Sequence, residues 1–467
     1  MLNTKETNLS LWVLVWPIFI ELFLQFLLGT VDTLMVSRIS DDAVAVVGFS
    51  NQLFNALTTL FVTISSGAGI LVAQKLGSRR EEQARTIAIM SFTVTGVIGI
   101  LISLMLYFVP STIAGWLQMP ERLLPMAKIY IQIVGSGMLL TAIMSALSTV
   151  IRNTGNTKGP MVTAVGMNIV HVILNYGFIF GAFGFPQLGL TGVACSTVIS
   201  RFIAVILLLF MFFQSFERRI QFKELLTFDK SLFKEILKIG WPLGVSNGNW
   251  VFSQLIIFTF IALLGPIELA ARTYMSTLES FCNLLGMSVA MGAQIQIAHL
   301  YGAGKYQDAY RTAYKAVFIG LALVLFNAGL LYGLGGMVLG WFTEDTEIIA
   351  IGVSLLALNV LLQPGKMVNM ALNSALNAVG DTKFTMITSL LSMWIVATAA
   401  SYLLSIHWGL GLLGIYICMI TDEYIRGLCA FLRWRGQRYL RIAQQLPVKV
   451  WRPWKKRVLT IKGQGSM

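Results

Sequence analysis

Charged residues are scarce in this chain of 467 residues. Only 12% of the residues are Asp, Glu, Lys or Arg, whereas 56% are hydrophobic, and the mean hydropathy is +0.75. A soluble domain of this length needs far more polar surface, and many segments exceed the roughly 18 apolar residues that cross a bilayer as a helix. The composition therefore excludes a soluble globular protein and predicts an all-α integral membrane protein.

Cysteines and recognisable catalytic motifs are also scarce. The four cysteines lie in apolar segments, with no spacing typical of a metal site, and we interpret them as small packing residues rather than disulfide partners. The GxxxxGK[ST] sequence that cradles nucleotide phosphates is absent, so we expect no ATP hydrolysis. No nucleophile motif and no cluster of metal ligands indicates a membrane-embedded enzyme. We therefore expect neither enzymatic activity nor a metal or other cofactor.

Long apolar runs are what the sequence has instead. The N-terminus lacks a strongly basic start and a small-residue cleavage site, so its apolar run is interpreted as a retained helix and not a signal peptide. Twelve transmembrane helices are predicted, at residues 9–37, 44–75, 86–109, 127–151, 160–182, 188–213, 236–264, 269–301, 311–335, 346–376, 384–405 and 409–433.

Positive charge gathers on alternate connections between these helices. The second, fourth, sixth and eighth connections are basic, and the segment after Phe431 carries ten Lys or Arg and no acid. The positive-inside rule then places the even connections and both termini in the cytoplasm, in a plasma (inner) membrane of bacterial type. The net charge of +13 is mostly a signal of this topology. Contact with anionic lipid fits the basic tail, and no nucleic-acid reading module accompanies it.

The second half of the sequence repeats the first in a constant register, which we call the repeat offset. The aligned pairs include Pro17 with Pro242, Gly77 with Gly302, Gly155 with Gly380 and Lys158 with Lys383. Each half holds six predicted helices, so the halves share one orientation and are related by a pseudo-two-fold axis along the membrane normal. Secondary transporters are often built this way, with a site between the halves. The predicted units are residues 1–213 (first six-helix bundle), 214–235 (cytoplasmic linker), 236–434 (second bundle) and 435–467 (basic cytoplasmic tail).

Three polar residues form a stripe in the first helix, which is otherwise apolar. Glu21, Gln25 and Asp32 are spaced by four and seven residues, so they share one helical face. Carboxylates inside a membrane usually face the protein interior or a water-filled cavity and mark functional sites. Because desolvation disfavours its charged form, such a carboxylate can load a proton on one side and release it on the other. When ionised, it could instead hold a sodium ion or an organic cation.

Other predicted helices carry polar residues on one face. Their candidates for substrate or ion contact are Asn168, His171, Asn175, Thr197, Asn247, Gln254, Glu279 and Lys366. Asn and Gln between membrane helices often only cross-link them, and Lys366 and Glu279 could pair as structural counter-ions. His171 could be a satisfied core histidine. Pro364 bends the helix of Lys366 and could open a site or form a hinge.

The chain resembles the multidrug and toxic compound extrusion (MATE) family up to about residue 435. The resemblance rests on Pro17, "VDTLMVSRISDDAVAVVG", "IRNTGNTKGPM", "NIVHVILNYGFIFGAFGFPQLGLTGVACSTVIS" and "NAVGDTKF". It implies a V-shaped pair of six-helix bundles that exports drugs or metabolites in exchange for protons or sodium. Asp32 matches the family's first-helix aspartate, which couples transport to the ion, and Thr197 matches a threonine near the same pocket.

The chain departs from the family's pattern at several positions that bear on the identity of the coupling ion. His171 and Asn175 stand where some relatives carry an Asn and, four residues later, an Asp. Lys366 stands where relatives of the NorM-like branch carry an aspartate, and Asn249-Trp250 where they carry another carboxylate. The pattern is closer to the DinF-like branch, whose coupling lies in the first half. We therefore expect protons rather than sodium.

These observations lead to a set of functional predictions. The chain is expected to be a monomeric antiporter that exports small cationic or amphipathic organic molecules by alternating access. A sodium-coupled exporter and a flippase of lipid-linked precursors are the alternatives. The predicted coupling residues are Asp32, Glu21, Asn175, His171 and Thr197. The predicted substrate-binding residues are Asp32, Gln25, Asn168, Asn247, Gln254, Glu279 and Lys366.

Overall fold

The computed structural model describes residues 10–116, 119–218 and 220–437. The predicted tail therefore lies, from residue 438 on, outside the described residues. Everything described is helix, turn or loop. The membrane-length segments are α1 (Leu11–Val36), α2 (Asp41–Gly77), α3 (Glu81–Phe108), the broken segment Glu121–Asn153, α7 (Lys158–Phe180), α8 (Leu190–Phe213), α9 (Lys230–Leu264), α10 (Pro266–Gly302), α11 (Tyr306–Gly333), α13 (Thr346–Ala378), the segment Thr382–His407 and α15 (Gly411–Arg435).

The prediction of an all-α membrane fold is confirmed. Eleven of these segments in the described part of the chain are long and apolar enough to cross a membrane. The twelfth, α15, is long enough but more polar, since it carries Asp422, Glu423 and Arg426 in its middle. Arg426 forms ion pairs with both carboxylates.

Several helices begin earlier than the apolar runs predicted. The first turn of α3 starts at Glu81 rather than residue 86, and α9 starts at Lys230, within the predicted linker 214–235. Asp229 caps α9 by accepting hydrogen bonds from the backbone N–H groups of Ser231 and Leu232. The predicted boundaries followed hydrophobicity alone. The cap on α9 lets this helix begin in polar sequence, before the apolar run.

Breaks and bends interrupt some of the spans. Gly137 separates α5 (Leu124–Ser136) from α6 (Met138–Asn153). The segment Thr382–His407 starts as α14 (Thr382–Ser392) and continues as π-helix. Short helices α4 (Pro110–Trp116) and α12 (Gly335–Gly340), with 3-10 turns η1 (Glu121–Leu123), η2 (Ala182–Gly184) and η3 (Phe222–Leu226), complete the chain.

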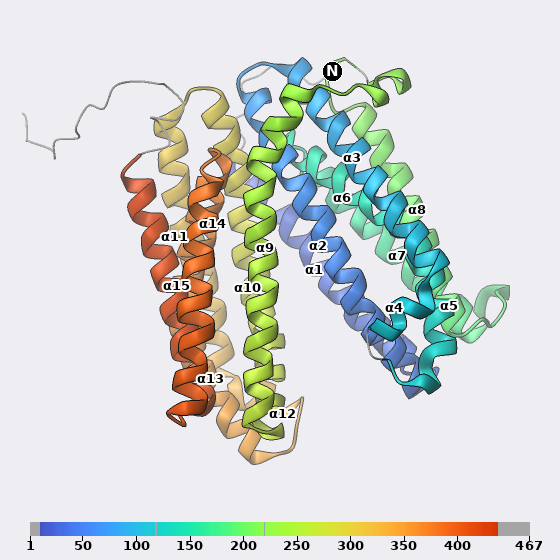
Figure 1. Ribbon diagram of the computed structural model, residues 1–467, viewed down its shortest axis with the longest axis vertical. Helices are drawn as coiled ribbons and strands as arrows, with labels where there is room; N and C mark the ends of the chain where they lie inside the picture. The colour runs from blue at the N-terminus through green and yellow to red at the C-terminus, as the bar shows by residue number, and fades with distance from the viewer. Residues whose placement is uncertain (1–9, 117–118, 219, 438–467) are drawn as a thin grey trace, which may run out of the picture.

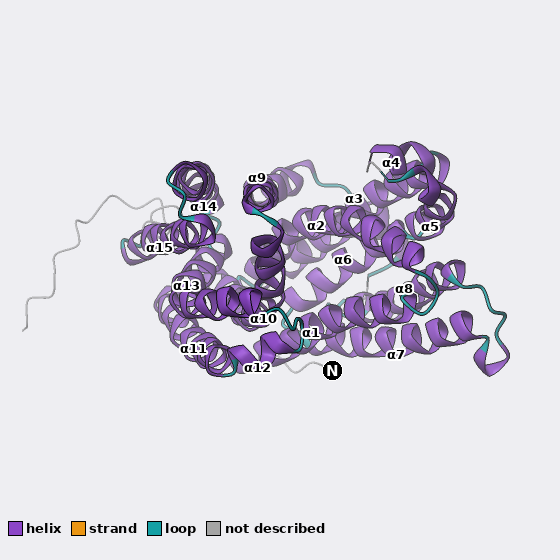
Figure 2. Cartoon of the chain, turned by 90° about the horizontal axis from the view of Figure 1, so that it is seen from below, coloured by secondary structure: helices purple, strands orange, loops and turns teal. Residues whose placement is uncertain are grey.

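The helices form two bundles, α1–α8 and α9–α15. Figure 1 shows the bundles meeting near its upper end and diverging toward the bottom. Figure 2, which views the molecule from below, shows α1 and α2 of one bundle lying against α10 and α9 of the other. We call the upper end of Figure 1, where α2 and α10 finish, the convergent end.

The contacts between the bundles follow the repeat offset that the sequence shows. On α2, Gly67 lies so close to Gly240 of α9 that an added Cβ would be 2.8 Å from its Cα. The equivalent pair is Gly292 of α10 and Val15 of α1, where a Cβ would be 2.7 Å from the valine Cγ2. The pseudo-two-fold relationship in the sequence is thus present in the packing.

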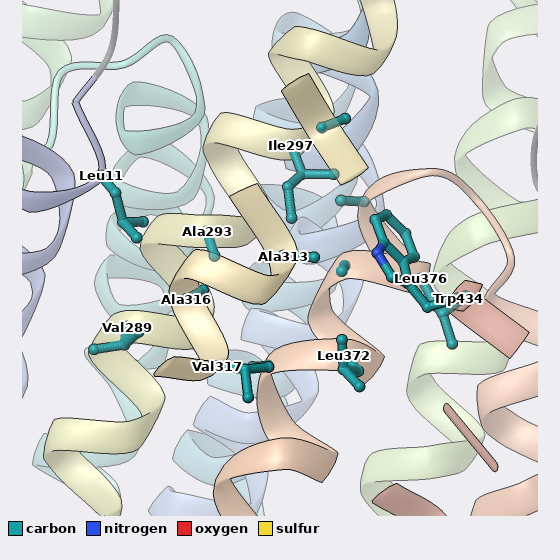
Figure 3. Close-up of a cluster of buried hydrophobic side chains, with 14 of the residues drawn as sticks. Leu11, Val289, Ala293, Ile297, Ala313, Ala316, Val317, Leu372, Leu376 and Trp434 are labelled. Atoms are coloured by element: carbon teal, nitrogen blue, oxygen red, sulfur yellow. The ribbon is translucent and has the colours of Figure 1, made fainter. Parts of the chain in front are cut away.

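An apolar cluster seals the convergent end. Leu11, Val15 and Ala73 of the first bundle pack with buried residues of the second, which include Val289, Ala293, Ile297, Ala313, Leu372 and Trp434. Figure 3 shows Leu11 lying across from Ala293 and Val289 of α10. Burying this apolar surface joins the two bundles at this end.

Candidate functional site

Asp32 of α1 and two polar residues of α7 meet inside the first bundle. The Oδ1 atom of Asp32 lies 2.7 Å from His171 Nε2 and accepts a hydrogen bond of 2.9 Å from Asn175 Nδ2. The His171 side chain is 3% exposed, but that of Asp32 is 21% exposed. The carboxylate therefore touches a buried imidazole on one side and remains accessible on the other.

Two serines of α8 complete this group. Ser196 donates a short hydrogen bond to Asn175 Oδ1, and Ser200 Oγ lies 3.2 Å from His171 Nδ1. Ser200 also donates to the carbonyl oxygen of Thr197 at 3.1 Å. In this arrangement Nδ1–H of His171 can donate to Ser200, whose own proton goes to Thr197 O. We call Asp32, His171, Asn175, Ser196 and Ser200 the Asp32 cluster.

This arrangement determines how many protons the Asp32 cluster can hold. With a proton on Nδ1, the contact of 2.7 Å needs a second proton between His171 and Asp32. That proton lies either on Nε2, as in a charge-assisted pair, or on the carboxyl group. When the cluster loses one proton, Nε2–H can still donate to Asp32, while Ser200 turns to donate to Nδ1. One proton can therefore leave with the heavy atoms in place.

Further polar residues surround the Asp32 cluster. Arg201 donates from Nη1 to Thr141 Oγ1 at 2.9 Å and interacts electrostatically with Asp32 and the buried Tyr130. Thr197, a predicted coupling residue, is buried, and its hydroxyl donates to Val193 O of its own helix. The Arg201 cation thus lies within electrostatic range of the carboxylate.

Glu21 lies apart from the Asp32 cluster, with a cation of its own. Arg152 of α6 donates from Nη1 to Glu21 Oε1 at 3.1 Å, and both residues are buried. Gln25, the third member of the predicted stripe, is exposed. From the sequence, Arg152 was assigned to a basic connection between two helices. In the structure it lies in the last turn of α6, and its side chain points into the bundle.

Asn168, one turn from His171 on α7, is buried without a hydrogen bond from its side chain to any described residue. Its amide nitrogen and its amide oxygen are both unpartnered. Buried polar groups of this kind usually have a partner, and a ligand or ordered water is the usual one when protein provides none.

In the second bundle, Glu279 of α10 is held by two buried partners. Arg272 Nη1 donates to both carboxylate oxygens at 2.9 Å, and the Tyr416 hydroxyl donates to Oε1 at 2.7 Å. Lys366 of α13 is half-buried and acts on Glu279 electrostatically. The direct counter-ion of Glu279 is therefore Arg272 rather than Lys366, the partner suggested by the sequence.

The remaining predicted substrate-binding residues lie on α9. Asn247 donates to Thr63 Oγ1 of α2 at 2.8 Å, so it links the two bundles. Gln254 is half-buried two turns further along α9. The structure thus brings together Asp32, His171 and Asn175, and none of the other predicted residues hydrogen-bonds to Asp32. Within residues 10–116, 119–218 and 220–437, no group of three His, Cys, Asp or Glu residues gathers around a metal position.

Sequence reasoning missed several of these partners. Ser196 and Ser200 lie four residues apart in "CSTVIS", a spacing that puts both hydroxyls on one helical face. Arg272 lies seven residues before Glu279, which is two turns along the same face. Both spacings could have been recognised. The Glu21–Arg152 pair joins residues 131 positions apart, so no local spacing indicates it.

Comparison with known proteins adds an independent line of evidence. The MatE family model matches residues 17–177 and 242–403, one region in each bundle. The uncharacterized transporter YisQ of Bacillus subtilis (strain 168) is 33% identical over 435 residues, which are 93% of this chain and 96% of that protein. A probable multidrug resistance protein NorM of Thermotoga maritima is 26% identical over 430 residues, 92% of each chain.

A solved structure of a MOP superfamily transporter from Pyrococcus furiosus has the same fold. Its TM-score is 0.83 at 18% sequence identity, with 93% of this chain and 96% of that chain covered. The named relatives do not separate the NorM-like from the DinF-like branch, so the branch stays a prediction. The two family matches begin at Pro17 and Pro242, which are equivalent positions of the internal repeat. The chain belongs to the MatE family of membrane transporters, the MATE family that its sequence resembles.

Proposed function

We propose that this protein is a secondary active antiporter, which exports cationic or amphipathic drugs or metabolites in exchange for protons by alternating access. The observation that carries the proposal is the contact of 2.7 Å between Asp32 and His171. It joins a partly exposed carboxylate to a buried imidazole, whose second nitrogen has a hydroxyl partner. Such a pair can take up and release one proton without rearrangement of the helices.

The same carboxylate can recognise an organic cation. When the proton leaves the pair, Asp32 is ionised and 21% of its side chain is exposed. A cationic substrate then gains the Coulombic attraction that His171 no longer supplies. Because proton and substrate bind to the same carboxylate, each lowers the affinity for the other, which is the linkage that antiport requires.

The groups around Asp32 favour a proton over a sodium ion. Asn175 turns its amide nitrogen to the carboxylate and its oxygen to Ser196. His171 also presents a nitrogen to Asp32. A hard cation prefers oxygen ligands, and here the groups nearest the carboxylate are N–H donors or nitrogen acceptors. These groups suit proton binding.

The expected sidedness follows from charge. Basic side chains gather near the convergent end, next to the C-terminus of α2. They are Lys75, Arg79, Arg80 and Arg218. The positive-inside rule would place this end in the cytoplasm, together with both termini, in a bacterial plasma membrane. The state described would then be closed toward the cytoplasm. A monomer suffices for this scheme, since both bundles belong to one chain.

The test is transport of a fluorescent organic cation, ethidium, into or out of liposomes that contain the purified protein. A proton gradient and a sodium gradient are imposed in separate experiments. We expect the proton gradient alone to drive transport against the ethidium gradient. Transport driven by sodium alone at fixed pH would replace protons with sodium in the proposal. Absence of ethidium transport under both gradients, with flipping of a lipid-linked precursor instead, would overturn it.

A further inference from the structure

A polar seam runs through the first bundle from the Asp32 cluster toward the convergent end. Four polar residues of α6 recur at intervals of four, four and three residues, so they share one helical face. We define the polar seam as these four residues with Glu21 and Asn168; its members are Thr141, Ser145, Thr149, Arg152, Glu21 and Asn168.

Both ends of the polar seam are tied by hydrogen bonds. At one end, Thr141 accepts from Arg201, which is in electrostatic contact with Asp32. At the other end, Arg152 donates to Glu21 Oε1 and to Thr149 Oγ1, at 3.1 and 3.5 Å. The α6 face therefore connects the surroundings of the Asp32 cluster with the Glu21–Arg152 pair.

The middle of the polar seam differs from its ends. Three of its side chains have buried polar atoms without a hydrogen bond to any residue the structure describes. These atoms are Asn168 Nδ2, Asn168 Oδ1, Ser145 Oγ and Glu21 Oε2. Leaving such groups unsatisfied is costly, and a water with two to four polar neighbours is the usual remedy in a protein interior.

Along the helix axes, Asn168 lies between His171 of the Asp32 cluster and the level of Glu21. α1 and α7 run parallel, because Val13 meets Thr157 near their starts and Asp32 meets His171 further on. Asn168 therefore lies about 4.5 Å from His171 along the helix axis, on the side of Glu21. Glu21 itself precedes Asp32 by eleven residues, about 16 Å, which is too far for a direct proton transfer.

We propose that water molecules bind among Asn168, Ser145 and the free Oε2 atom of Glu21, and that this polar seam conducts protons between the Asp32 cluster and the convergent end in the state of the transport cycle in which the cluster is closed to the opposite side. The inference rests on the proposed proton coupling. Asn168 is a positioning residue in this scheme, because its amide orients water and carries no proton itself. Glu21 is the second proton carrier, with its other oxygen fixed by Arg152.

The proton transfers balance without any co-reactant. The O–H or N–H bond at the Asp32–His171 pair breaks as an O–H bond forms on the first water. Each water gives up one proton as it receives another. The last water transfers its proton to Glu21, where a new O–H bond forms at Oε2. Glu21 then releases this proton to water at the convergent end. No electrons are gained or lost in any step.

The test compares substitutions of Asn168 in the full chain, reconstituted in liposomes with a trapped pH-sensitive dye. Asn168→Leu removes both polar groups, whereas Asn168→Ser keeps a hydroxyl and room for water. Asn359→Leu is the control, because Asn359 is a fully buried asparagine of the second bundle, outside the polar seam, whose oxygen accepts a hydrogen bond from Gln363. Ethidium-driven proton flux and the ethidium Kd are measured for each.

We expect Asn168→Leu to slow the proton flux about tenfold at saturating ethidium, because one hydrogen-bonded step is lost. Asn168→Ser should retain most of the flux, and Asn359→Leu all of it. An unchanged flux in Asn168→Leu overturns the polar seam, as does equal slowing in all three variants. Should Asn168→Leu fail to fold, Ser145→Ala must slow the flux, and an unchanged rate refutes the inference. Absence of proton flux in the unsubstituted protein overturns the proposed function together with the polar seam.

Discussion

His299 of α10 donates a hydrogen bond of 2.8 Å from Nε2 to the backbone carbonyl oxygen of Asn153, across the interface between the two bundles. Its equivalent at the repeat offset is Gln74 of α2, which donates from Nε2 to the carbonyl oxygen of Ala378 at 2.6 Å. Asn153 and Ala378 are equivalent in the same register. Two symmetry-related side chains thus cap the ends of α6 and α13 and hold the convergent end closed.

Substitution of His299 should loosen this closure. His299→Ala removes one of the two hydrogen bonds and leaves a helix-end carbonyl without its donor, at a cost of about 1–3 kcal/mol. We expect faster hydrogen–deuterium exchange at the ends of α2 and α10 in this variant. His299→Gln should restore slow exchange, because it copies Gln74 at the equivalent position. Equal exchange in His299→Ala and the unsubstituted protein would show that His299 does not hold the bundles together.

Two glycines allow the helices of the convergent end to approach. A Cβ at Gly77 would lie 2.1 Å from His299 O, and a Cβ at Gly302 would lie 2.0 Å from Gln74 O. These neighbours are backbone atoms, which cannot rotate away, so each Gly→Ala change should destabilise the closed end by about 1–3 kcal/mol. Ethidium transport should slow in both variants. Gly96→Ala is the control, because open space surrounds that Cβ, and slowing there too would remove the argument.

Substitution of one partner of the buried Glu21–Arg152 pair should lower the stability of the protein. Arg152→Leu or Glu21→Leu alone leaves an uncompensated charge in the bundle, with an expected loss of about 3–5 kcal/mol. The double variant removes both charges and should lose less than the sum of the single losses. The apparent Tm of the purified protein in detergent provides the measurement. Additive effects of the two substitutions would mean that the pair is not coupled in solution.

Much of the fold was predictable because helices in a membrane must satisfy their own backbone hydrogen bonds, so length and hydropathy identify them. The polar surroundings of Asp32 were predictable for a similar reason, since a carboxylate in an apolar helix usually faces the protein interior. The starts at Glu81 and Lys230 were not, because both helices begin in polar sequence before the apolar run. Arg152 was assigned to a connection, because charge near the end of a span resembles the positive-inside signal.

Asp32→Asn should abolish proton-coupled export while expression stays normal. The amide is nearly the same size as the carboxyl group and can still hydrogen-bond to His171, but it carries no charge and takes up no proton at neutral pH. The measurement is resistance of cells to ethidium, with the amount of protein in the membrane determined in parallel. Export equal to that of the unsubstituted protein would show that Asp32 is not the coupling residue.

His171 should determine how transport depends on pH. The groups that face it are Asp32, Asn175 and Ser200, and Arg201 adds a fixed cation near Asp32. His171→Gln can still donate a hydrogen bond to Asp32 but cannot hold a proton, whereas His171→Ala does neither. We expect both variants to flatten the pH profile of ethidium transport, with lower overall rates in His171→Ala because Asp32 loses its donor. A pH profile that keeps its shape in His171→Gln would make His171 a packing residue and leave Asp32 as the only proton carrier of the cluster.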